Sequence, residues 1–259
     1  MEITHLSSTV NIKTILEDFN KGTFEINGLF PGYGLTLGNA LRRALLSSLP
    51  GAAVTYIKIK NAPHEFTTLP GIKEDIIEIC LNFKKLRFKM HTNDPQTLFL
   101  KAKGEKVVTG KDIEENSLVE VVNKDQQIAT LTNKNALLEV ELTVERGMGY
   151  VPTEARKSEK LPIGTIALDA FFSPVVKVSY EVENMRVGER TDYNRLIINI
   201  ETDGTISPSS ALRKVSSILK DHFEKIMEVQ VKEFDVDTKK ETKSETSVSS
   251  QTSKKKSKS

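Results

Sequence analysis

Residues 31–51, with the sequence PGYGLTLGNALRRALLSSLPG, constrain this chain of 259 residues more than any other stretch. The glycines at its start and Pro50-Gly51 at its end bracket a helix of about three to four turns, with Thr36 as the expected N-cap. One side of this helix is apolar, which predicts a stripe buried in the chain's own core. The stripe consists of Leu37, Leu41, Ala44, Leu45 and Ser48.

The opposite side of the same helix combines Asn39, Arg42, Arg43 and Leu46. A helix that only covers a monomeric core gains nothing from a leucine beside arginines on its outer face. Two usable faces therefore predict a helix that packs into its own domain and docks a second protein chain. The alternative is that Leu46 is one of the single exposed leucines that are normal on protein surfaces.

Three glycines, Gly32, Gly34 and Gly38, also form a G-x-G-x-x-x-G pattern that approaches a dinucleotide-binding fingerprint. That fingerprint requires an acidic residue at the end of the following strand, where it holds a ribose. The expected strand, residues 53–60, ends in Lys-Ile-Lys without a carboxylate. We therefore reject a nucleotide-binding function for this stretch.

Composition limits the class of protein further. The single cysteine, Cys80, excludes an internal disulfide and a cysteine-based zinc cluster, and the four histidines show no metal-ligand spacing. We expect no membrane span and no signal peptide, because no apolar run is long enough. Residues 239–259 hold seven lysines and two glutamates, so the other 238 residues carry 30 basic and 33 acidic side chains. This slightly acidic body argues against a broad duplex-binding surface.

The rest of the chain predicts an α+β protein with antiparallel strands. A strand is expected at residues 23–29, a second helix from Ile72 to Lys85, and many short strands over residues 86–145 and 163–200. Loops are expected at residues 146–152 and 184–193. Ser207 and Pro208 begin a last helix whose apolar face is wider than one sheet requires. The alternating glutamates of residues 139–145 indicate a solvated strand face rather than a general acid–base pair.

Four sequence blocks, in the same order, resemble the alpha subunit family of bacterial and plastid RNA polymerase. They are TLGNALRRALLSSLPG at residues 36–51, HEF…GIKEDIIEI…LNFK within residues 64–84, RGMGYVP at residues 146–152, and FSPV…YEVEN…RVGERTD…TDGTISP within residues 172–208. The resemblance covers roughly residues 10–230, and four ordered matches of this length are highly specific.

The resemblance implies a discontinuous dimerisation subdomain, residues 1–50 and 171–232, built from an antiparallel sheet with two helices. A mostly-β subdomain, residues 51–170, is inserted between its halves, and residues 233–259 form a disordered Lys/Ser-rich tail. Two copies pair through the first and last helices, and this homodimer is the assembly platform for the beta and beta-prime subunits in transcription, with omega and sigma joining in the holoenzyme. The implied subunit has no catalytic centre, no metal and no cofactor, and it meets DNA only through the assembled complex.

The resemblance also implies docking roles for particular residues. Arg43 and Leu46, with the adjacent Arg42, match positions that dock beta. Lys84, Leu168 and Asp169 match positions that face beta-prime. The implied dimer interface consists of Tyr33, Leu37, Leu41, Ala44, Leu45, Leu212, Val215, Leu219, Phe223 and Ile226.

This sequence departs from the family after the fourth block. Family members continue into a small helical C-terminal domain that reads promoter DNA and contacts activators, whereas this sequence ends at Ser259 in a lysine–serine tail. We expect the functions of that domain to be absent, and we expect the chain to act in the bacterial cytoplasm, with a plastid as the open alternative.

Two other functional hypotheses stay open from the sequence. One is a stand-alone enzyme that uses the glycine-rich stretch or the carboxylates of residues 139–145. The other is a specialised paralogue that dimerises without engaging the large subunits. Sedimentation separates the enzyme from the platform, because the platform requires a dimer.

Overall fold

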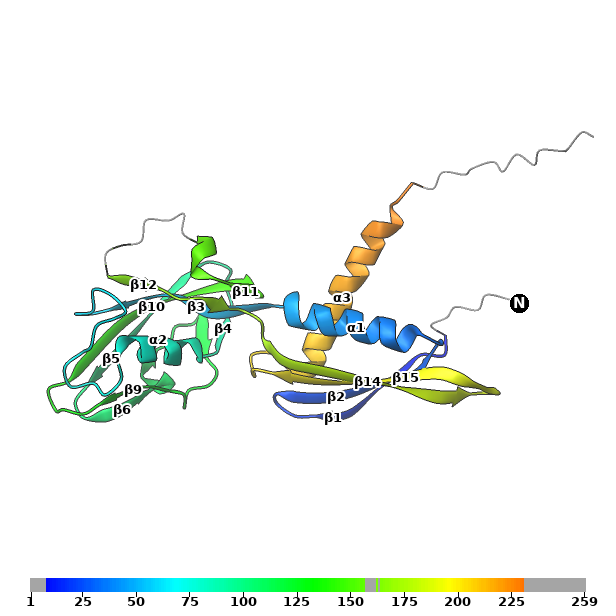
Figure 1. Ribbon diagram of the computed structural model, residues 1–259, viewed down its shortest axis with the longest axis horizontal. Helices are drawn as coiled ribbons and strands as arrows, with labels where there is room; N and C mark the ends of the chain where they lie inside the picture. Colours follow the sequence, from blue (N-terminus) through cyan, green and yellow to red (C-terminus); the bar gives the residue numbers. More distant parts are fainter. Residues whose placement is uncertain (1–7, 157–161, 163, 231–259) are drawn as a thin grey trace, which may run out of the picture.

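The computed structural model describes residues 8–156, 162 and 164–230, and the tail expected at residues 233–259 lies outside these residues. Within the described residues the chain forms three α-helices and sheets whose strand pairs are all antiparallel, which confirms the α+β class. The elements divide into two bodies joined where β3 leaves α1 and where the chain returns before β14 (Figure 1).

The first body is a four-stranded sheet built from both ends of the described chain. Its strand order is β1–β2–β15–β14, so a strand from the C-terminal part lies beside one from the N-terminal part. Helices α1 (Tyr33–Ser47) and α3 (Pro208–Met227) pack on this sheet and against each other (Figure 1). The strands are β1 (Asn11–Glu17), β2 (Lys21–Leu29), β14 (Val175–Val187) and β15 (Arg190–Thr202).

A compact apolar cluster, which we call the smaller core, holds these helices to the sheet. It combines alternate residues of β2 and β15 and two valines of β14 with the apolar stripe of α1 and the first turns of α3. The cluster consists of Phe24, Ile26, Leu29, Leu41, Ala44, Leu45, Leu49, Val175, Val178, Leu196, Ile198, Ile200, Ala211 and Val215. Among the residues that the structure describes, its members come from residues 24–49 and 175–215.

The second body contains the other strands and α2 (Ile76–Lys84). Its main sheet has the order β7–β5–β10–β3–β4–β8, and β12 pairs with β3 beside this path. The strands of this sheet are β3 (Pro50–Ile59), β4 (Phe88–Met90), β5 (Gln96–Lys103), β7 (Ile113–Glu114), β8 (Val119–Val121), β10 (Leu137–Met148) and β12 (Thr165–Ala167). The remaining pairs are β6 (Lys106–Thr109) with β9 (Gln127–Leu131), and β11 (Tyr150–Val151) with β13 (Ala170–Phe171).

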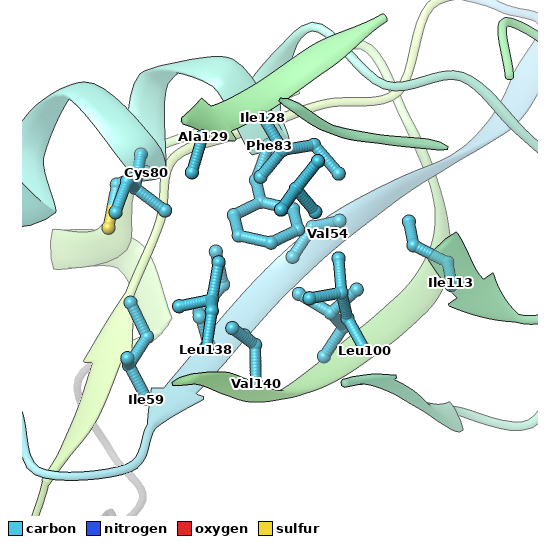
Figure 2. Close-up of a cluster of buried hydrophobic side chains, with 14 of the residues drawn as sticks. Val54, Ile59, Cys80, Phe83, Leu100, Ile113, Ile128, Ala129, Leu138 and Val140 are labelled. Atoms are coloured by element: carbon cyan, nitrogen blue, oxygen red, sulfur yellow. The ribbon is translucent and has the colours of Figure 1, made fainter. Parts of the chain in front are cut away.

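A separate apolar cluster, the larger core, fills the second body between α2 and the sheet. Figure 2 shows Phe83 of α2 pointing into this cluster, with Val54 of β3 and Leu138 of β10 around it. Cys80 lies in the same cluster, and burial raises the pKa of its thiol to about 11, so it acts as a small apolar residue rather than a nucleophile. All members of the larger core fall between residues 54 and 168.

The last helix begins where its sequence predicts. Ser207 is the N-cap, its side chain accepts a hydrogen bond from the Ser210 amide at 3.4 Å, and Pro208 is the first helical residue. The first helix differs from the prediction, because Thr36 is not its N-cap. The N-cap is Gly32, four residues earlier, the helix begins at Tyr33, and the Thr36 hydroxyl donates back to the carbonyl of Gly32 at 3.3 Å.

Three other local predictions are wrong in detail. The second helix begins at Ile76 after an Asp75 N-cap, because Ile72 pairs with Leu131 in an isolated bridge. Residues 146–148 extend β10 instead of opening a loop. Residues 184–193 are mostly the ends of β14 and β15, which continue to Val187 and Arg190 around a turn with Gly188 at φ 63°.

Candidate subunit-docking sites

The outer face of α1 places the predicted beta-docking residues in three different settings. Arg43 is exposed, and its guanidinium makes no hydrogen bond or ion pair with the described residues. Arg42 is also exposed, but its Nε donates to the carbonyl of Val178 on β14 at 3.4 Å. Leu46 is half-buried against the smaller core, so its side chain faces outward only in part. Arg43 is therefore the member of this set whose side chain is available to a partner.

The start of α1 is held by a residue far away in the sequence. The side chain of Asn194 on β15 is 8% exposed, and its Oδ1 accepts hydrogen bonds from the amides of Gly32 (2.9 Å) and Gly34 (3.4 Å). Helix α1 has no side-chain cap of its own, so Asn194 satisfies amides that the first turn leaves unpaired. The glycines permit the approach, since a Cβ on Gly34 would lie 2.7 Å from Val182 Cγ1.

Replacing Asn194 with alanine should therefore destabilise the fold by about 1–2 kcal/mol, because two helix amides lose their acceptor. Asn194→Asp keeps an acceptor oxygen at the same place and adds a negative charge near a helix N-terminus, so it should retain most of the stability. Urea unfolding measures both variants. If the alanine variant and the native chain have equal free energies of unfolding, Asn194 does not act as the cap of α1.

The G-x-G-x-x-x-G pattern also has a structural explanation. Gly34 and Gly38 face the sheet, and a Cβ on Gly38 would lie 2.6 Å from the ring of Tyr180. Gly32 precedes the helix with φ 87°, a left-handed conformation that favours glycine. The three glycines thus let α1 begin sharply and pack closely on β14 and β15, which accounts for the pattern without a nucleotide.

The predicted beta-prime-facing residues come together at the end of α2. Lys84 Nζ lies 3.5 Å from Asp169 Oδ2, although 85 residues separate them. Asp169 Oδ1 accepts two hydrogen bonds from Thr153, one from its amide at 3.0 Å and one from its hydroxyl at 3.1 Å. These bonds and the Lys84 charge hold the pKa of Asp169 below its usual value against the opposing effect of desolvation. Asp169 is therefore ionised and fixed before any partner arrives.

Leu168 differs from its two neighbours in this site because its side chain is buried in the larger core. Its amide donates to the carbonyl of Thr55 at 2.9 Å, and its own carbonyl accepts from Arg156. The Arg156 guanidinium also lies over the ring of Tyr56, 5.3 Å from the centroid. Thr153 and Arg156, both in the short 3₁₀ helix η2 (Thr153–Arg156), thus hold the segment that carries Asp169. Sequence reasoning missed both, because neither belongs to a recognisable motif.

Replacing Thr153 with valine should raise the pKa of Asp169 towards its ordinary value, because one of the two Thr153 hydrogen bonds to the carboxylate is lost. A lowered pKa in the folded state gives stability that is complete above the unfolded pKa and is lost as the pH falls through the folded pKa. In the variant this contribution to stability should be smaller, and its loss should be complete at a higher pH. Carbon-detected NMR titration of Asp169 measures the shift, and an unchanged pKa would contradict the assigned contact.

The predicted dimer residues separate into three groups by exposure. Leu41, Ala44, Leu45 and Val215 are buried in the smaller core of their own chain. Leu37, Leu212 and Leu219 are half-buried against it. Tyr33, Phe223 and Ile226 are exposed, the last two at 59% and 65%. In Figure 1 the C-terminal half of α3 extends away from the sheet, and every residue from Lys220 to Met227 is exposed.

One carboxylate of β10, that of Glu139, forms ion pairs with lysines of neighbouring segments. Glu139 lies 2.6 Å from Lys60, which follows β3, and 3.1 Å from Lys101 on β5, and these contacts keep its pKa below the usual range. A carboxylate held ionised in this way is unsuited to act as a general acid. In the part of the chain that the structure describes, no group of three or more histidine, cysteine, aspartate or glutamate side chains is arranged to hold a metal ion. No helix among these residues is long and apolar enough to cross a membrane.

The larger core corresponds to a known domain class. Residues 57–173 match the family described as the RNA polymerase Rpb3/RpoA insert domain, and these bounds enclose most of the second body. The first body, with its sheet drawn from both chain ends, surrounds this insert in the sequence. The fold therefore defines a class of polymerase subunits in which an insert domain, here the second body, divides the sequence of another domain, here the first body.

Curated relatives extend the match to both bodies. The chain is 47% identical over 222 residues to the DNA-directed RNA polymerase subunit alpha of Alkaliphilus oremlandii, covering 86% of this chain and 70% of the relative. It is 50% identical over 208 residues to that of Roseiflexus castenholzii, covering 80% of this chain and 64% of the relative. It is 47% identical over 221 residues to that of Clostridium botulinum (strain Eklund 17B / Type B), covering 85% of this chain and 70% of the relative. The chain belongs to the family of DNA-directed RNA polymerase alpha subunits.

Proposed function

We propose that this chain pairs with a second copy and that the pair is the platform on which the beta and beta-prime subunits of a DNA-directed RNA polymerase assemble. The chain itself supplies contact surfaces, while nucleotidyl transfer and DNA binding belong to the assembled complex, which works in the bacterial cytoplasm or a plastid. The observation that carries the proposal is the exposed apolar side chains on the C-terminal half of α3, where Phe223 and Ile226 lie beyond the smaller core. A large exposed apolar patch is typical of a protein–protein interface.

Three surfaces have separate roles in this proposal. The exposed end of α3 and Tyr33 contact the second copy, with the half-buried Leu37, Leu212 and Leu219 at the base of that contact. The outer face of α1, centred on Arg43 and flanked by Arg42 and Leu46, docks beta. The Lys84–Asp169 pair, supported by Leu168, faces beta-prime.

The two cores support a division of labour between subdomains. Residues 1–50 and 171–232 would be the dimerisation subdomain, which contains the smaller core, and residues 51–170 would be the insert, which contains the larger one. The alpha-subunit names of the relatives support the place of the chain in the polymerase. Omega and sigma would then join the complex through the large subunits.

Co-expression with both large subunits from the same genome tests the proposal. Purification through a tag on this chain should recover beta and beta-prime together. Recovery of the chain without either large subunit would overturn the platform. An assembly that retains both large subunits but contains one copy of this chain would overturn the dimer alone.

A further inference from the structure

The two bodies are joined by two crossings of the chain that pack tightly against each other. The first crossing includes Gly51 at the start of β3, and the second includes Phe172 before β14. A Cβ on Gly51 would lie 1.9 Å from the Phe172 carbonyl oxygen, so only glycine fits there. Gly147 lies against the Phe172 ring in the same way, with a Cβ distance of 2.6 Å. The crossings thus form one packed connection between the bodies.

A second connection is made by side chains alone. Arg87, which follows α2 in the insert, places its Nε 3.7 Å from Oδ2 of Asp203, which follows β15 in the other body. The side chains of Arg87 and Asp203 are 30% and 8% exposed, respectively. An ion pair with one buried partner is screened less by solvent than a surface pair.

Both partners of this pair are fixed on their own side of the junction. Arg87 Nη1 donates to the carbonyls of Lys84 (3.0 Å) and Leu86 (3.1 Å), and the Arg87 amide donates to Asn123. Asp203 Oδ1 accepts from the amide and hydroxyl of Thr205 at 2.9 and 2.6 Å. A charge contact between two anchored side chains transmits orientation, because neither can follow the other without breaking local bonds.

An apolar contact lies beside the ion pair. Gly204, with φ 88°, leaves room for Phe19 from the β1–β2 turn and for Val122 from the insert. A Cβ on Gly204 would lie 2.7 Å from Phe19 Cε1 and 3.4 Å from Val122 Cγ1. The turn after β15 therefore lies close both to Phe19 of its own body and to Val122 of the insert.

We propose that Arg87 and Asp203 are positioning residues that fix the angle between the two bodies, and with it the relative placement of the Arg43 face and the Lys84–Asp169 site. This role rests on the proposed docking functions of those two sites. When one partner is already bound, a platform that holds its two sites in one arrangement gives the second partner a higher effective concentration than a hinged platform does.

Distances within the free chain test the positioning role without any partner. Spin labels at Lys13→Cys on β1 and Lys103→Cys on β5 report on the two bodies, since both side chains are exposed and the native Cys80 is buried. Labelled chain refolded with a large excess of unlabelled chain gives distances within one copy. Arg87→Asp and Asp203→Arg should each broaden the distance distribution, and the exchanged pair, Arg87→Asp with Asp203→Arg, should narrow it again. An unchanged distribution in both single variants would overturn the proposal.

Assembly gives the functional readout. The single variants should recover each large subunit alone as the native chain does, but should recover the two together about two- to fivefold less well, the range of a partly exposed charge contact. Lys111→Asp is the matched control. It reverses the charge of one partner of an exposed ion pair, Lys111 with Asp125 within the insert, and should not change joint recovery. A native chain that captures no large subunit would refute the docking function and leave the distance result standing. Equal joint recovery in the native chain and the variants would refute the coupling.

Discussion

Replacing Phe223 with aspartate should leave the chain folded and convert the proposed homodimer into a monomer. Phe223 is 59% exposed and lies outside the smaller core, so its own chain loses little apolar contact. In the dimer the same change would place an uncompensated carboxylate in an apolar interface, at a cost of about 3 kcal/mol or more. Sedimentation equilibrium measures the association, and urea unfolding confirms the fold.

The control for this prediction lies on the same helix. Ser217 is exposed and stands about half a turn around α3 from Ile226, so Ser217→Asp should leave the dimer intact. Leu219→Asp is a less specific test, because Leu219 is half-buried against the smaller core and its loss would also destabilise the monomer. If the dimer survives Phe223→Asp, or if Ser217→Asp dissociates it equally well, the interface does not lie on the face of α3 that carries Phe223 and Ile226.

Replacing Arg43 with alanine should weaken capture of beta by about 2 kcal/mol, roughly 30-fold, if the guanidinium is a central anchor of the contact. The fold should be unaffected, because the exposed guanidinium makes no hydrogen bond or ion pair with the described residues. Titration of tagged chain with purified beta measures the affinity. Capture of beta-prime should be unchanged, which separates this face from the Lys84–Asp169 site.

Two further substitutions test whether the Arg43 guanidinium docks beta. Arg43→Lys keeps the charge but loses the planar fork of donors, so it should restore only part of the affinity. Lys13→Ala removes an exposed cation from β1, in the same body but away from α1, and should have no effect. If Arg43→Ala and Lys13→Ala bind beta equally well, the docking role of this face is refuted.

The elements predicted correctly are those encoded by neighbouring residues. The N-cap serine and following proline of α3 lie side by side in the sequence, and the alternation of β10 is continuous, so both could be recognised directly. The start of α1 was misplaced because its cap, Asn194, lies 162 residues beyond Gly32. Residues 184–193 are rich in charge and contain glycine, which is typical of a loop, although strand pairing between β14 and β15 decides their conformation.

The candidate sites show the same division between local and distant information. The family resemblance named Lys84 and Asp169, and the structure brings them into contact. Thr153 and Arg156 could not be found from the sequence, because their role depends on where η2 meets the segment around Leu168. Helical periodicity placed Leu46 on the outer face of α1, but the contact of α1 with α3 and the sheet half-buries it.

The mass of the complex purified through this chain tests the central claim most directly. Native mass spectrometry of that complex should find two copies of the 28.9 kDa chain with one beta and one beta-prime subunit. A single copy of the chain in the complex, or a chain that is monomeric and free of both large subunits, would contradict the account.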